Sequence, residues 1–89
     1  MKVRVLRLAH DSILDGFNFY EDKEHGLGAR FIESILSDIR SLRISGCGHM
    51  IVHEDFHRKV CTKFPFSIYY KVEYSEINVY RVFDNRRGP

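Results

Sequence analysis

The C-terminal segment carries a dense group of charged side chains that could bind a partner. Asp84 is followed by Arg86 and Arg87, directly after a run of β-branched and aromatic residues. A guanidinium group presents a planar fork of N–H donors that matches the oxygens of a carboxylate or a phosphate. We interpret these residues as a contact site for an anionic partner; the alternative is a solvated tail without a partner.

A second basic cluster contains Arg58, Lys59 and Lys63 in a run of strand-like composition. Side chains alternate across a strand, so Lys59 and Lys63 are predicted on the face opposite Arg58. If helices cover the apolar face, both lysines lie on the open face, where RNA or a protein partner would bind. An ordinary solvent-facing strand is the alternative.

Arg81 lies in the last strand-like run, on the side that alternation assigns to Val79 and Phe83. It is interpreted either as a paired structural arginine or as the inner wall of a site. Three tyrosines could stack on bases, although core packing or cross-strand pairing is the structural alternative. They are Tyr69, Tyr74 and Tyr80.

Four side chains with ligand chemistry occur in the middle of the chain: Cys47, His49, His53 and His57. Their spacing matches no standard zinc finger or ribbon, so we expect no metal and no other cofactor. Cys47 and Cys61 do not make the disulfide framework of a small secreted domain, and reduced thiols are expected.

The composition is that of an ordinary globular domain, with 44% hydrophobic and 29% charged residues among 89. No apolar run approaches the roughly 20 residues of a spanning helix, and we expect one cytoplasmic domain over residues 1–89. The net charge of +2 is uneven. Residues 1–56 hold seven Lys/Arg and nine Asp/Glu, whereas residues 57–89 hold seven and three. The basic half fits an anionic partner, although solvated charge explains it equally well.

The elements that position these side chains follow from hydrophobic periodicity. A first strand is predicted near residues 2–8, then a helix whose start Asp11 and Ser12 cap. The apolar side of this helix contains Ile13, Leu14, Phe17 and Tyr20, and Gly16 weakens it. Residues 21–24 form an acidic end, which opposes the helix dipole and is predicted to lie in solvent.

A second helix is predicted from Gly28 until the loop at residues 45–48. Its apolar positions recur at three- and four-residue steps, which is typical of an amphipathic helix. They are Phe31, Ile32, Ile35, Leu36, Ile39 and Leu42. The residues predicted on the opposite side are Glu33, Ser34, Asp38, Arg40 and Ser41.

The period then changes to two, which predicts strands at residues 50–53 and 57–64 and a corner at residues 64–66. Residues 66–73 and 77–83 form a predicted hairpin around a turn at residues 74–76, at the centre of the sheet. The fold class is therefore α+β, in the order β-α-α-β-β-β-β. The helical hairpin should pack on one face of a mainly antiparallel, twisted sheet.

Four segments together resemble the RelE/ParE superfamily of toxins from bacterial type II toxin-antitoxin modules. They are Phe19-Tyr20-Glu21, Gly26-Leu27-Gly28-x-x-Phe31, Phe64-Pro65-Phe66-x-Ile68-x-Tyr70 and Val82-Phe83-x-x-Arg86-Arg87-x-Pro89. The resemblance implies a growth inhibitor, held inactive in a hetero-oligomer by a cognate antitoxin. It also implies a target: RelE-like members cut mRNA on the ribosome, whereas ParE-like members poison DNA gyrase.

Two positions depart from the nuclease branch of this superfamily. Ser67 replaces a basic residue after the Phe-Pro-aromatic corner, and Asp84 replaces the histidine of the common C-terminal motif. Acid-base catalysis favours a group that titrates near pH 7, which an ordinary aspartate does not. These departures favour a gyrase poison over a ribonuclease and leave the catalytic residues, if any, unassigned.

Overall fold

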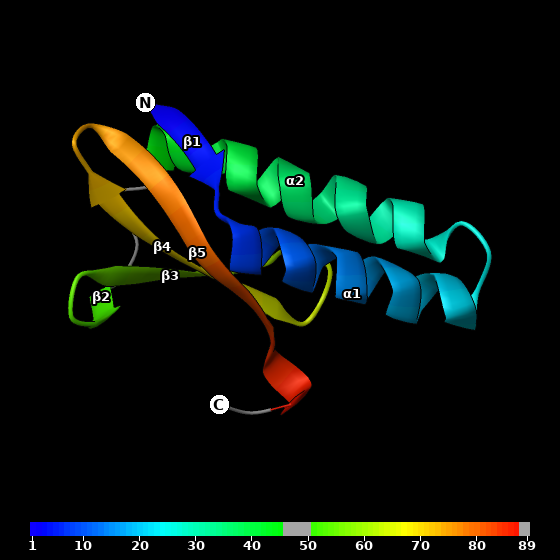
Figure 1. The fold of residues 1–89 in the computed structure, drawn as a ribbon. Helices are drawn as coiled ribbons and strands as arrows, with labels where there is room; N and C mark the ends of the chain where they lie inside the picture. The colour runs from blue at the N-terminus through cyan, green and yellow to red at the C-terminus, as the bar shows by residue number, and fades with distance from the viewer. Residues whose placement is uncertain (46–50, 88–89) are drawn as a thin grey trace.

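The computed structural model describes residues 1–45 and 51–87, and for residues 51–53 the backbone alone. Its elements have the predicted β-α-α-β-β-β-β order, which confirms the α+β class (Figure 1). Their bounds are β1 Lys2–Val5, α1 Arg7–Lys23, α2 Leu27–Ser45, β2 Ile51–His53, β3 Phe56–Val60, β4 Phe66–Glu73 and β5 Glu76–Asp84, and a 3₁₀ turn, η2, spans Asn85–Arg87. The predicted loop after α2 lies outside the described residues beyond Ser45.

The described strands form one mixed sheet in the order β1-β5-β4-β3-β2. β1 runs parallel to β5, and the other neighbours are antiparallel. The β4–β5 hairpin lies centrally, as predicted, and it closes through Tyr74 and Ser75 with φ angles of 51° and 63°. Two consecutive positive φ angles are typical of the type I′ turn, whose twist matches that of the flanking strands.

Both helices lie on one face of the sheet, and no described helix covers the other face, which we call the open face (Figure 1). Phe31, Ile35, Ile68 and Tyr70 are fully buried between the helices and the sheet. Gly16 of α1 is buried where the helices meet, and a Cβ at this position would lie 2.5 Å from Cζ of Phe31. The glycine that weakens α1 by propensity therefore permits the close approach of α2.

The start of α1 differs from the prediction. The helix begins at Arg7, so Asp11 and Ser12 lie inside it, and the Ser12 hydroxyl donates to the Leu8 carbonyl oxygen at 3.0 Å. Leu14 was predicted on the apolar side, but its side chain is exposed. The prediction relied on a capping side chain, but Leu6 precedes the helix without one, and its backbone N–H donates to the Val79 carbonyl oxygen of β5 at 2.9 Å.

The acidic end of α1 also differs, because Glu21 does not point into solvent. Its carboxylate accepts hydrogen bonds from the backbone N–H groups of Gly26 (3.1 Å) and Gly28 (3.0 Å). These bonds lower the pKa of Glu21, the Gly26 bond contributing most. The carboxylate thus satisfies free donors at the start of α2, where the helix dipole also favours negative charge.

Two polar residues of α2 were assigned to the wrong face. Ser34 and Asp38 are both buried, and the Asp38 carboxylate accepts hydrogen bonds from the Thr62 backbone N–H (3.0 Å) and hydroxyl (3.1 Å). Asp38 thereby fastens the segment after β3 to α2. This segment is not strand, so β3 ends at Val60 and not at residue 64 as predicted.

Candidate functional site

The C-terminal charged group is packed against α1 and is not a free tail. Arg86 donates from Nε and Nη2 to the two carboxylate oxygens of Asp84, at 3.0 and 2.9 Å. The same Nη2 donates to the Tyr20 hydroxyl at 3.2 Å, and the guanidinium lies over the rings of Phe19 and Tyr20. Arg86 therefore anchors the end of the chain to α1.

Asp84 is held in its ionised form by these contacts. It also accepts a hydrogen bond from the Arg86 backbone N–H at 2.9 Å, and Nε of Arg87 lies 3.8 Å from its Oδ2. Hydrogen bonding to the Arg86 side chain is the largest cause that lowers the pKa of Asp84. At neutral pH the carboxyl group is deprotonated and cannot act as a proton donor.

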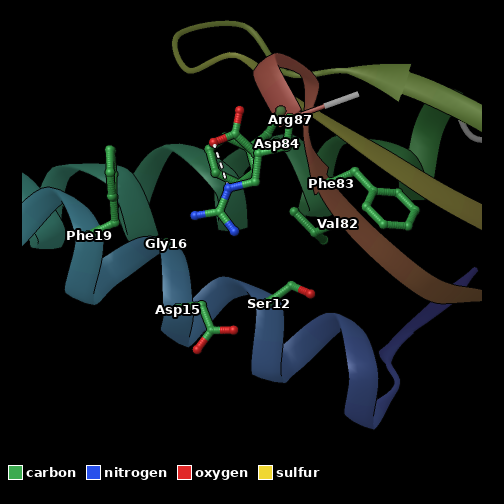
Figure 2. Close-up of a pocket in the computed structure, with 9 residues that line it drawn as sticks. Ser12, Asp15, Gly16, Phe19, Val82, Phe83, Asp84 and Arg87 are labelled. Atoms are coloured by element: carbon green, nitrogen blue, oxygen red, sulfur yellow. Dashed lines mark ion pairs between the residues drawn. The ribbon is translucent and has the colours of Figure 1, made fainter. Parts of the chain in front are cut away.

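Asp84 and Arg87 border a hollow of about 280 Å³ between β5 and α1. Figure 2 shows Ser12 and Asp15 on α1 opposite Asp84 and Arg87, with Val82 between the two sides. The Arg87 side chain is largely exposed, unlike the Asp84 carboxylate. Of the two arginines in the C-terminal group, Arg87 is the more accessible.

Replacing Arg86 by alanine is expected to lower the free energy of unfolding by roughly 1 kcal/mol. This is below the usual value for a hydrogen bond to a charged group, because half of the Arg86 side chain is exposed. Asp84 has a lowered pKa in the folded state, so its contribution is present above the unfolded-state pKa and is lost as pH falls through the folded-state pKa. The difference between wild type and R86A should therefore shrink in acid, measured by urea unfolding at several pH values.

Arg87→Ala is the matched control, since among the described residues Arg87 has the longer ion pair with Asp84 as its polar contact. It should change stability by less than about 0.5 kcal/mol. Equal losses in the two variants would contradict the anchoring role of Arg86.

The open face of the sheet carries a group that we call the arginine face: Arg58, Tyr69, Arg81 and Phe83. Arg58 and Arg81 are the direct neighbours of Tyr69 on the two flanking strands. Tyr69 alternates with the fully buried Ile68 and Tyr70, so this row points away from the helices. The tertiary structure thus brings together two arginines that are distant in sequence.

A β-bulge decides which way Arg81 points. Tyr69 pairs with Arg81 while Tyr70 pairs with Val79, so Tyr80 is an extra residue in β5. Val79 is consequently in the core, whereas Arg81 is exposed and lies over the Phe83 ring at 5.7 Å. The prediction that Arg81 shares a side with Val79 is wrong for this reason.

Ser67 positions one member of the arginine face through a hydrogen bond. Its hydroxyl accepts a hydrogen bond from Nε of Arg58 at 3.1 Å and donates to Oδ1 of Asn85 at 2.8 Å. Ser67 is fully buried. The residue that takes the place of a basic side chain therefore positions another one, Arg58, and ties β4 to the C-terminal turn.

Lys59 and Lys63 are not on the open face. Lys59 pairs directly with Ile68 of β4, which is a core residue, so Lys59 lies on the helix side. Lys63 follows the end of β3 and lines a groove with residues of α2, among them Arg30 and Ser34. The predicted orientation is wrong because Arg58, and not Lys59, is in register with Tyr69.

A second cluster on the open face is held together by contacts among its own side chains. Lys71 lies over the rings of Phe56 and Tyr80, and the Tyr80 hydroxyl donates to Glu73 at 2.8 Å. Hydrogen bonds from Asn78 and then Tyr80 lower the pKa of Glu73, and the bond to Glu73 raises that of Tyr80. The sequence signal for this cluster was the alternation of side chains along β4 and β5, which places its members on the same face.

The predicted ligand-type residues do not assemble where they can be described. Cys47 and His49 lie outside the described residues, as does the His53 side chain, while His57 stacks on Tyr70. Within residues 1–45 and 51–87, no three His, Cys, Asp or Glu side chains are grouped as a metal site. Burial raises the pKa of the Cys61 thiol to about 12, so it stays protonated.

Comparison with known proteins finds similar solved structures, but no matching family model or curated sequence. A chain from the chromosomal ParDE TA system of P. aeruginosa superposes on it with a TM-score of 0.82, over 94% of this chain and 95% of that one. The fold is shared. The sequence identity is 17%, so the likeness concerns the fold alone.

None of the described helices is long and apolar enough to cross a membrane. The seven predicted contact residues fall into three places. Arg58 and Arg81 lie on the arginine face, Asp84, Arg86 and Arg87 lie beside α1, and Lys59 and Lys63 lie on the helix side. Sequence reasoning missed Tyr20 and Ser67 as the residues that position two of these arginines.

Proposed function

We propose that this protein is the toxin of a type II toxin-antitoxin module, which inhibits growth in the cytoplasm until a cognate antitoxin binds it. The fold that it shares with a chain of a ParDE TA system supports this proposal. The resemblance to RelE/ParE toxins in four segments supports it independently. Phe31 of one of those segments contacts Phe64 and Phe66 of another, so residues of these motifs take part in core packing.

For the target we favour DNA gyrase, and the observation that carries this preference is the state of Asp84. It stands in place of the nuclease histidine, yet two arginines hold it ionised. Ser67, in place of a basic residue, is buried with its hydroxyl engaged. At neutral pH the ionised Asp84 cannot donate a proton as the histidine would, and the Ser67 hydroxyl carries no charge, so these two positions favour binding without catalysis.

An mRNA endoribonuclease is the second candidate, because the arginine face has features of an RNA-binding surface. Two guanidinium groups flank Tyr69, and Tyr69 contacts Phe83 edge to face. Arginines neutralise phosphates, and exposed aromatic rings stack on unpaired bases. Among the described residues of this face, however, no histidine is available for acid-base catalysis.

Induced expression is expected to arrest growth with cleaved DNA and a DNA-damage response, while mRNA remains intact. Time-resolved mRNA sequencing and gel analysis of chromosomal DNA from the same cultures check this. The double variant R58A/R81A should lose the arrest, because it removes both cations of the arginine face. Arg7→Ala, an exposed cation on α1, should retain it. Cuts in translated mRNA that precede DNA damage would show that the ribosome is the target.

A further inference from the structure

A groove between α2 and the segment that follows β3 has no role in the target site proposed above. Its volume is about 440 Å³, and we call it the α2 groove. Hydrogen bonds from Thr62 to Asp38 fasten one end of the segment to α2. At the other end, the Phe64 ring packs edge-on against Tyr20 and Phe31. Core contacts therefore fix both walls, as in a preformed ligand site.

One hydroxyl group in the α2 groove lacks a hydrogen-bond partner. Ser34 lines the groove with only 9% of its surface exposed, and its Oγ has no partner among the described residues. Buried polar side chains are hydrogen-bonded in the large majority of cases. A serine inside a helix can donate to a carbonyl oxygen of the preceding turn, as Ser41 and Ser45 of α2 do. The Ser34 hydroxyl does not, and it is available to a polar atom of a ligand.

Two cations lie on opposite walls of the groove, Arg30 on α2 and Lys63 on the segment after β3. Among the described residues, Lys63 has no ion-pair partner. Arg30 bonds to Glu24 at 3.0 Å, but both side chains are largely exposed, and such a surface pair contributes little and is easily exchanged. Glu33 is the acidic side chain of the lining. The lining therefore keeps a net positive charge.

We propose that the α2 groove binds a phosphate group, either free or carried by a small organic molecule. Phosphate oxygens accept hydrogen bonds from guanidinium, ammonium and hydroxyl groups at once, and Arg30, Lys63 and Ser34 supply one of each. A carboxylate has fewer oxygens for donors that come from two walls. Leu27 and Phe64 also line the groove, and an organic part of the ligand would pack against them. The site does not depend on the toxin function proposed above.

The test uses the full-length protein and phenyl phosphate near neutral pH, with affinities measured by titration calorimetry. Binding should shift the backbone amide signals of Thr62 and Lys63 in ¹⁵N NMR spectra. Lys63→Gln should bind about tenfold more weakly, because a hydrogen bond to a charged group is lost. Arg43→Gln is the matched control, since Arg43 is an exposed cation of α2 outside this groove, and it should retain the wild-type affinity.

Ser34→Ala separates ligand binding from a structural role of the hydroxyl. The variant should bind phenyl phosphate about fivefold more weakly, because one hydrogen bond to the phosphate is lost. Its free energy of unfolding without ligand should stay at or above the wild-type value, since a buried and unpaired hydroxyl is removed. A less stable S34A protein with unchanged affinity would overturn the inference, because water or the helix would then hold the hydroxyl.

Two further ligands decide the chemistry of the site. Benzoate should bind about fivefold or more weakly than phenyl phosphate, and equal binding would overturn the phosphate assignment. Inorganic phosphate distinguishes the sources: weaker binding than phenyl phosphate indicates an organic ligand, and equal binding indicates free phosphate. Failure of both phosphates to bind, or shifts confined to the arginine face, would overturn the inference. A wild-type protein that binds phenyl phosphate without arresting growth would refute only the toxin function.

Discussion

Replacing Ile35 by alanine is expected to lower the free energy of unfolding by about 2–5 kcal/mol, the range for large-to-small changes in packed cores. Ile35 is fully buried on the side of α2 that faces the sheet. Its removal leaves a cavity that neighbouring side chains fill incompletely, because the helices are already in close contact. Urea unfolding followed by circular dichroism measures the loss.

Leu36→Ala provides the internal comparison. Leu36 is only partly buried and lines a groove with residues of β1, so less apolar surface is lost to water. Its loss of stability should be clearly smaller than that of I35A. Sequence periodicity assigns both positions to the apolar side of α2. Equal losses of unfolding free energy in the two variants would show that the side of α2 facing the sheet is assigned incorrectly.

Gly16→Ala is expected to destabilise the protein by about 1–3 kcal/mol, the usual cost of overpacking. The added Cβ would lie 2.5 Å and 2.6 Å from two ring atoms of Phe31, which is fully buried and cannot move aside freely. Helix propensity alone predicts the opposite, a gain of up to about 1 kcal/mol. The sign of the change therefore decides between propensity and packing.

Asn18→Ala on the same helix is the control, since Asn18 is exposed. It should change stability by less than about 0.5 kcal/mol. A stabilised G16A variant, with a melting temperature above wild type, would mean that α1 and α2 pack less closely than the structure shows.

The sequence alone was sufficient for the fold class, the second helix and the central hairpin. Each of these rests on a local signal: the three- and four-residue spacing of α2, the alternation in β4, and the tight turn before Glu76. Local periodicity predicts such elements because the side chains of one element must share one buried face.

The tertiary structure decided which charged side chains lie together. The bulge at Tyr80 turns Arg81 to the open face, and strand register turns Lys59 away from it. Asp38 is buried because Thr62, far along the chain, supplies its hydrogen bonds. Pairing between distant residues determines these positions. The pattern of neighbouring residues in the sequence carries no information about that pairing. The same reason explains the α2 groove, whose two cations come from segments that are adjacent only after folding.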